Sequence, residues 1–90
     1  MPTIFVRHRL TDYEAWRPIY DDDVERRDAA GVREVGVYTD PNDPNVVLIV
    51  FDADNTDGFI EMMGSEDLRA KMEGAGVVGA PEVWIGEKHE

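Results

Sequence analysis

Val46-Val47-Leu48-Ile49-Val50-Phe51 is a run of six consecutive apolar residues that follows the turn-forming segment Pro41–Asn45. The run is too short for an ordinary helix and rich in β-branched residues, so it predicts a strand. Because successive side chains of a strand point to opposite faces, one face carries Val46, Leu48 and Val50, and the other carries Val47, Ile49 and Phe51. Both faces need cover. The helical segments of so short a chain cover one face, and we expect a second copy of the protein to cover the other.

The composition restricts the class of protein. A chain of 90 residues predicts a single domain over residues 1–90, and a domain of this size buries only about two thirds of the surface that its unfolded form exposes. Twenty acidic residues against nine basic ones give a net charge of −11, which disfavours nucleic acid and anionic membranes as partners. There is no cysteine, and Met1–Val6 is not the start of a secretory signal or a membrane span. We expect a cytoplasmic protein.

The first part of the chain predicts a strand followed by a long helix. Thr3–Arg9 mixes apolar and basic residues and reads as a strand on which His8 shares a face with Ile4 and Val6. The sequence does not say which face meets the helices.

Thr11 and Glu14 have the spacing of a capping box, so we expect a helix over about residues 12–30 that begins after Thr11. Pro18 lacks an amide hydrogen and crowds the preceding turn, which predicts a kink at that residue. The charged residues 21–28 are expected on the solvent side of this helix.

The second part of the chain predicts a hairpin, a broken helix and a final strand. The hairpin consists of a strand over Val32–Asp40 and the apolar strand. The helix that follows is capped by Asn55 or Thr56 and interrupted at Gly64-Ser65. A glycine-rich loop over Gly74–Gly79 then leads to a strand over Glu82–Gly86. This order gives an α+β fold, the ferredoxin-like βαββαβ sandwich with a four-stranded antiparallel sheet, in which the first and third strands lie in the middle. Since the third strand is apolar on both faces, we expect two sheets to pair face to face as a dimeric α/β barrel.

Five segments carry a resemblance to a known superfamily. They are Val6-Arg7-His8-Arg9, Asp12–Pro18, Asp43–Val47, Ser65–Arg69 and Gly76–Val83. In these segments the chain resembles the dimeric α/β-barrel superfamily, and in particular small proteins similar to antibiotic biosynthesis monooxygenases. The resemblance implies a homodimer and a pocket between the sheet and the helices. It implies no single reaction, because the superfamily includes cofactor-free oxygenases, haem-degrading enzymes, cyclases, isomerases and domains without known activity.

The candidate site residues follow from that pocket, and each has two interpretations. The pKa of a histidine normally lies near neutrality, so His8 is a candidate general base, or else a hydrogen-bonded structural histidine. Tyr13, Trp16 and Tyr20 share a helical stripe that forms either an aromatic wall for a flat ligand or part of the core. Tyr38 either donates a hydrogen bond into the pocket or packs at the edge of the sheet.

Other charged residues have weaker functional interpretations. Arg7 and Arg9 share a face and could hold a carboxylate or phenolate, or form ion pairs with acidic residues across the dimer. The haem-degrading relatives bind iron through a histidine on the second helix, where this chain has none, so a haem role is disfavoured. Neither His8 with His89 nor Asp21-Asp22-Asp23 has the spacing of a metal site, so we expect no metal and no cofactor.

Two functions remain open. The first is a cofactor-free monooxygenase or cyclase acting on a small aromatic or polyketide-like compound. In that enzyme His8 would take a proton, while Tyr13, Trp16, Tyr20 and Tyr38 would enclose the ring. The alternative is a non-catalytic dimeric module that binds a small ligand or assists a partner protein.

Overall fold

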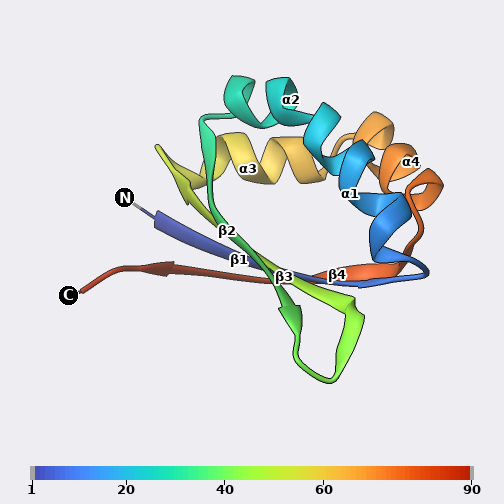
Figure 1. Ribbon diagram of the computed structural model, residues 1–90. Coiled ribbons are helices and arrows are strands. Elements are labelled where there is room, and N and C mark those ends of the chain that lie inside the picture. Colours follow the sequence, from blue (N-terminus) through green and yellow to red (C-terminus); the bar gives the residue numbers. More distant parts are fainter. Residues whose placement is uncertain (1, 90) are drawn as a thin grey trace.

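The structure, a computed structural model, describes residues 2–89. Within that range the strands are β1 (Pro2–Leu10), β2 (Val32–Asp40), β3 (Asp43–Ala53) and β4 (Val77–Glu87). They form one antiparallel sheet in the order β2-β3-β1-β4. The helices are α1 (Tyr13–Asp22), α2 (Val24–Ala29), α3 (Thr56–Met63) and α4 (Glu66–Gly74). All of them lie on the same face of the sheet (Figure 1). The predicted ferredoxin-like fold, with β1 and β3 in the middle, is confirmed.

The two central strands form the core together with the helices. In the β1–β3 register, Ile4 lies opposite Phe51 and Val6 lies opposite Ile49, and all four side chains are buried on the helical face. The opposite face carries the other set, including Leu48 and Val50, with no helix above it (Figure 1). The alternation predicted for the apolar strand is therefore confirmed on both faces.

The predicted cap of the first helix was wrong. Asp12 is the cap residue, and its side chain accepts a hydrogen bond from the Glu14 amide at 3.1 Å. Thr11 instead donates its backbone N–H to the carbonyl oxygen of Gly76 at 2.9 Å, which ties the end of β1 to the start of β4. By contrast, Asn55 caps α3 and Ser65 caps α4 after the predicted interruption at Gly64.

The first helical region breaks at Asp23 and not at Pro18. Pro18 lies within α1, on its exposed side, where water can reach the Glu14 carbonyl that Pro18 leaves without a donor. Asp23 has φ −92° and ψ 13°, and its N–H bonds back to α1 before α2 begins in a new direction. Because of this break, Arg27 is buried, which corrects its predicted place on the solvent side.

The last strand begins earlier than predicted. Val77–Glu87 is one strand, so the second half of the expected glycine-rich loop is part of β4. Its pairing with β1 shifts, since Arg7 pairs with Glu82 and Arg9 pairs with Val78. Three residues of β4, 79–81, therefore lie opposite the single residue His8 of β1, which makes a bulge. Gly79 accommodates this bulge with φ +72°. No helix of the described residues is long and apolar enough to cross a membrane.

Candidate functional site

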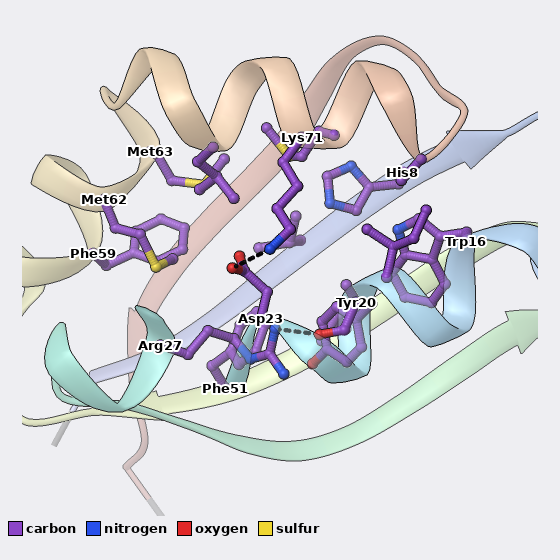
Figure 2. A pocket seen from close by; sticks show the side chains of 16 residues that line it. His8, Trp16, Tyr20, Asp23, Arg27, Phe51, Phe59, Met62, Met63 and Lys71 are labelled. Carbon is purple, nitrogen blue, oxygen red and sulfur yellow. Dashed lines mark hydrogen bonds and ion pairs between the residues drawn. The ribbon is translucent and has the colours of Figure 1, made fainter. Parts of the chain in front are cut away.

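A cavity of about 70 Å3 lies between the sheet and the helices. This is room for roughly five water molecules, and about half of the roughly 150 Å3 of a cavity that holds benzene. Its walls come from both central strands and from all the helical segments (Figure 2). Most of the lining is apolar and includes Val6, Trp16, Ile19, Ile49, Phe51, Phe59, Met62, Met63, Leu68 and Met72. Methionine side chains are flexible, so this wall can adapt to the shape of a ligand.

His8 is the buried polar group of this wall. The alternation of β1 turns it to the helical face with Ile4 and Val6, and its side chain is 6% exposed. Its Nδ1 atom is buried and has no hydrogen-bond partner among the described residues. Burial lowers the pKa of His8 to about 4, so the imidazole is neutral at physiological pH. The predicted alternative of a hydrogen-bonded structural histidine does not account for this unpartnered nitrogen.

The aromatic stripe of α1 is divided by the structure. Trp16 is buried and stacks on Tyr20, with ring centroids 4.7 Å apart and an angle of 24° between the planes. Both rings line the cavity. Tyr13 packs beside Trp16 but outside the lining, and its backbone N–H donates to Asn45. The stripe thus forms both a cavity wall and part of the core.

Tyr38 lies away from the cavity. It pairs in register with Leu48, whose side chain belongs to the face without helices, and its ring lies over Gly36. The side chain is exposed on that face. Its predicted place in the wall with the other aromatic residues is corrected accordingly. Of the predicted site residues, the structure brings His8, Trp16 and Tyr20 to one cavity.

Tyr20 contributes its ring to the cavity and not its hydroxyl. The hydroxyl donates a hydrogen bond to Glu34 Oε1 at 2.8 Å. Burial and this hydrogen bond to a carboxylate raise the pKa of Tyr20 well above its usual range. The phenol is therefore neutral and already engaged, and it does not serve as an acid or base for a ligand in the cavity.

A charged group that sequence reasoning missed lies at the cavity. It consists of Asp23, Arg27 and Lys71. Lys71 Nζ lies 3.1 Å from Asp23 Oδ1, and Arg26 Nε lies 3.2 Å from Asp23 Oδ2. Arg27 donates from one Nη to the Tyr20 carbonyl oxygen at 2.9 Å, with its Cζ 3.9 Å from the Tyr20 ring centroid. The helix break at Asp23 turns this part of a charged run inward, and the sequence pattern gave no signal of that break.

The two arginines of β1 do not reach the cavity. Arg7 and Arg9 lie on the face of the sheet without helices, in register with Leu48 and Val46. Arg7 forms an ion pair with Glu82 of the same chain at 3.2 Å, whereas the predicted pairing was with acidic residues across the dimer. Among residues 2–89, no group of three or more histidine, aspartate or glutamate side chains is placed to hold a metal ion.

Comparison with known proteins shows a shared fold. No family model and no curated protein matches the sequence. Among solved structures, a proposed antibiotic biosynthesis monooxygenase from Caulobacter crescentus is similar with a TM-score of 0.72 and 12% identity, over 99% of this chain and 90% of that one. SnoaB, a cofactor-independent oxygenase from Streptomyces nogalater, is similar with a TM-score of 0.72 and 11% identity, over 99% of this chain and 93% of that one.

A third similar structure has a different description. An uncharacterized NIPSNAP domain protein from Burkholderia xenovorans gives a TM-score of 0.66 and 14% identity, over 98% of this chain and 94% of that one. The resemblance to antibiotic biosynthesis monooxygenases predicted from the sequence is confirmed at the level of the fold. At these identities the likeness concerns the fold alone, and any activity has to be argued from the cavity.

Proposed function

We propose that this protein is a cofactor-independent enzyme of the oxygenase or cyclase kind that acts on a small aromatic compound in the cavity. The observation that carries this proposal is the buried Nδ1 of His8, which has no hydrogen-bond partner within the described part of the chain. A buried polar atom without a partner is costly, and a ligand hydroxyl in the cavity would satisfy it. The similarity to SnoaB supports the oxygenase reading, since that protein is described as a cofactor-independent oxygenase.

In this proposal His8 accepts a proton from the substrate. Trp16 and the apolar side chains hold the ring and exclude water. Loss of a proton from an acidic hydroxyl or methylene leaves an electron-rich anion. In the oxygenase case this anion supplies the electrons that reduce O2, so that a CH2 group and O2 become a C=O group and water. In the cyclase case the same anion attacks a carbonyl carbon of the substrate, the carbonyl π electrons move to its oxygen, and that oxygen takes the proton back from His8, so no O2 is consumed.

The low pKa of His8 sets a condition on this chemistry. An imidazole with a pKa of about 4 holds a proton poorly in the empty cavity. A substrate anion left beside the new imidazolium would raise that pKa, because opposite charges attract strongly in an apolar environment. Proton transfer is therefore expected only with the substrate bound next to His8.

The volume of the cavity limits the size of the substrate. A volume of about 70 Å3 is smaller than the roughly 150 Å3 that holds benzene, so even a compound with one ring requires the flexible wall to open. A larger polyketide-like compound would require movement of Met62, Met63 or Met72, which line the cavity.

The second candidate is a non-catalytic module that binds a small ligand. It is favoured because two other ionisable side chains of the lining, Tyr20 and Asp23, already have partners within the protein. The Tyr20 hydroxyl is bonded to Glu34, and Asp23 is paired with Lys71. His8 then has no second acid or base beside it, and its unpartnered nitrogen would only orient a ligand.

Two copies are proposed to pair through the face of the sheet without helices. Register places Phe5 between Val50 and Trp84, which gives an apolar row across three strands. Trp84 is 54% exposed and Tyr38 is exposed beside this row. Isolated proteins rarely leave such a patch open, and the same patch on a second copy would be self-complementary around a two-fold axis.

The experiment that tests the function uses the chain's two histidines as a matched pair. Oxygen uptake and product formation are measured with a panel of single-ring phenols and hydroquinones. Activity in the wild type that persists in His89→Ala and is lost in His8→Ala supports the enzyme. Turnover unchanged by His8→Ala overturns the role of His8. Saturable binding without oxygen uptake or ring closure for any compound favours the binding module.

A further inference from the structure

Arg27 is a buried cation without an anionic partner among the described residues. Its side chain is 8% exposed, and its guanidinium packs on the Tyr20 ring and bonds to the Tyr20 carbonyl oxygen. None of the ion pairs among the described residues includes it. A guanidinium has five N–H donors, and although Asp28 and Glu34 line a neighbouring pocket with Arg27, neither forms an ion pair with it. Burying a charge in this way is costly unless something else, such as a ligand, supplies the opposite charge.

The charge balance at the cavity is positive, although the whole protein carries −11. Arg27 and Lys71 line the cavity, and Asp23 is the one carboxylate in the described lining. Asp23 is shared, because it binds both Lys71 and Arg26. Asp23 is thus engaged by two cations, while Arg27 is a further cation in the lining that forms no ion pair with it. Charges there interact more strongly than on the surface, because little water screens them.

The cavity thus has two different polar ends. Figure 2 shows His8 on one side and Arg27 on the other, with the Asp23–Lys71 ion pair between them. Apolar side chains, including Phe51 and Phe59, form the wall between these ends. A ligand that satisfies both ends has a hydroxyl for His8, an apolar body, and an anionic group for Arg27.

We propose that the cavity selects a small aromatic carboxylate, with Arg27 as the residue that determines specificity for the anionic group. The planar guanidinium matches a carboxylate through two parallel N–H···O hydrogen bonds, which a lysine cannot reproduce. Lys71 adds positive charge but remains held by Asp23. This inference rests on the proposed function, since it names the class of compound that the same cavity takes.

The test compares 4-hydroxybenzoate with 4-hydroxybenzamide, which has nearly the same shape and hydroxyl but no charge. Isothermal titration calorimetry on the wild-type protein is expected to give a Kd for the acid that is about tenfold to hundredfold lower than for the amide. Added salt should reduce this ratio, because it screens the charge on the acid.

Variants then assign the preference to one residue. Arg27→Gln should bring the two Kd values together, and Arg27→Lys should restore only part of the difference. Arg69→Gln makes the same change in net charge at an exposed residue of α4 and should keep the wild-type ratio. Circular dichroism establishes that each variant is folded, and the wild-type ratio remains decisive should Arg27→Gln fail to fold.

The outcomes separate this inference from the function on which it rests. Equal binding of the acid and the amide by the wild type overturns the anion preference and leaves the cavity as a site for neutral phenols. A preference that survives Arg27→Gln overturns the assignment to Arg27. Absence of saturable binding of either compound, together with no effect of His8→Ala on any panel compound, overturns both proposals.

Discussion

Lys71 Nζ lies 3.1 Å from Asp23 Oδ1, and this ion pair joins α4 to the junction between α1 and α2 above the cavity. Arg26 reaches the same carboxylate at 3.2 Å and also lies 3.5 Å from the hydroxyl of Ser65 at the start of α4. The Asp23 side chain is 13% exposed, and that of Lys71 is 39% exposed. Asp23 is therefore the common point at which the two helical halves of the layer are held together.

The two partners of this ion pair should differ in their effect on stability. Asp23→Ala removes the carboxylate that two cations share at this junction and is expected to lower the free energy of unfolding by about 2 kcal/mol. Lys71→Met leaves Asp23 paired with Arg26, and since Lys71 is partly exposed the loss should stay below about 1 kcal/mol. Urea unfolding at neutral pH measures both values. A larger loss for Lys71→Met than for Asp23→Ala would contradict the central role of Asp23.

The burial of His8 predicts a specific dependence of stability on pH. Its pKa is about 4 in the folded protein and about 6.5 in the unfolded chain, so the unfolded chain binds the proton more readily. The contribution of uncharged His8 to the free energy of unfolding is therefore complete above about pH 6.5 and is lost as the pH falls toward 4. Between pH 7 and pH 5 the free energy of unfolding should fall by about 2 kcal/mol from this group alone.

The measurement compares urea unfolding of the wild type, His8→Gln and His89→Ala at several pH values. Glutamine does not titrate, so the difference between wild type and His8→Gln isolates this group from the acidic residues. His89 is exposed, and its variant should follow the wild-type curve. Parallel curves for wild type and His8→Gln would show that His8 titrates normally in the folded protein.

Gly58 should tolerate no side chain, because a Cβ atom there would overlap the carbonyl oxygen of Ala30. Gly58→Ala is expected to lower the free energy of unfolding by about 1 to 3 kcal/mol, since the start of α3 would be pushed away from the end of α2. Gly74→Ala is the matched control, because a Cβ atom at this last residue of α4 has no atom within 4 Å. That substitution should stabilise by up to about 1 kcal/mol. Thermal unfolding of the two variants compares them directly, and equal effects would contradict the close approach at Gly58.

The proposed pairing of two copies predicts an effect of Trp84 on mass in solution. The wild type should sediment at about twice the chain mass of 10.2 kDa. Trp84→Glu places a charge in the apolar row beside Phe5 and should shift the protein to the monomer. Ile60→Glu makes the same change at an exposed apolar residue of α3 and should leave the dimer intact. A wild type that sediments at the chain mass at high concentration would refute the pairing.

Much of the fold follows from local patterns that the structure preserves. The run Val46–Phe51 predicted a central strand with two apolar faces, and the register with β1 confirms it. The caps at Asn55 and Ser65 were also predictable, because their side chains bond to amides only two or three residues ahead. Strands and caps of this kind are determined by residues close together in the chain, so they can be predicted from one sequence.

The polar part of the candidate site was not predictable in the same way. Pro18 gave a stronger local signal for a break than Asp23, yet the break lies at Asp23, where tertiary contacts with Lys71 and Arg26 hold the carboxylate. The burial of Arg27 follows from that break. The orientation of Tyr38 depended on which face of the sheet the helices cover, which alternation along one strand does not decide.

The bulge in β4 has a consequence for the outer edge of the sheet. β4 is an edge strand, and within it Gly79 adopts a left-handed conformation two residues before Pro81, which has no N–H to donate. The edge therefore lacks the uninterrupted row of donors and acceptors on which another chain could add as a further strand. In a crowded cell, this interruption protects the protein against edge-to-edge polymerisation into fibres.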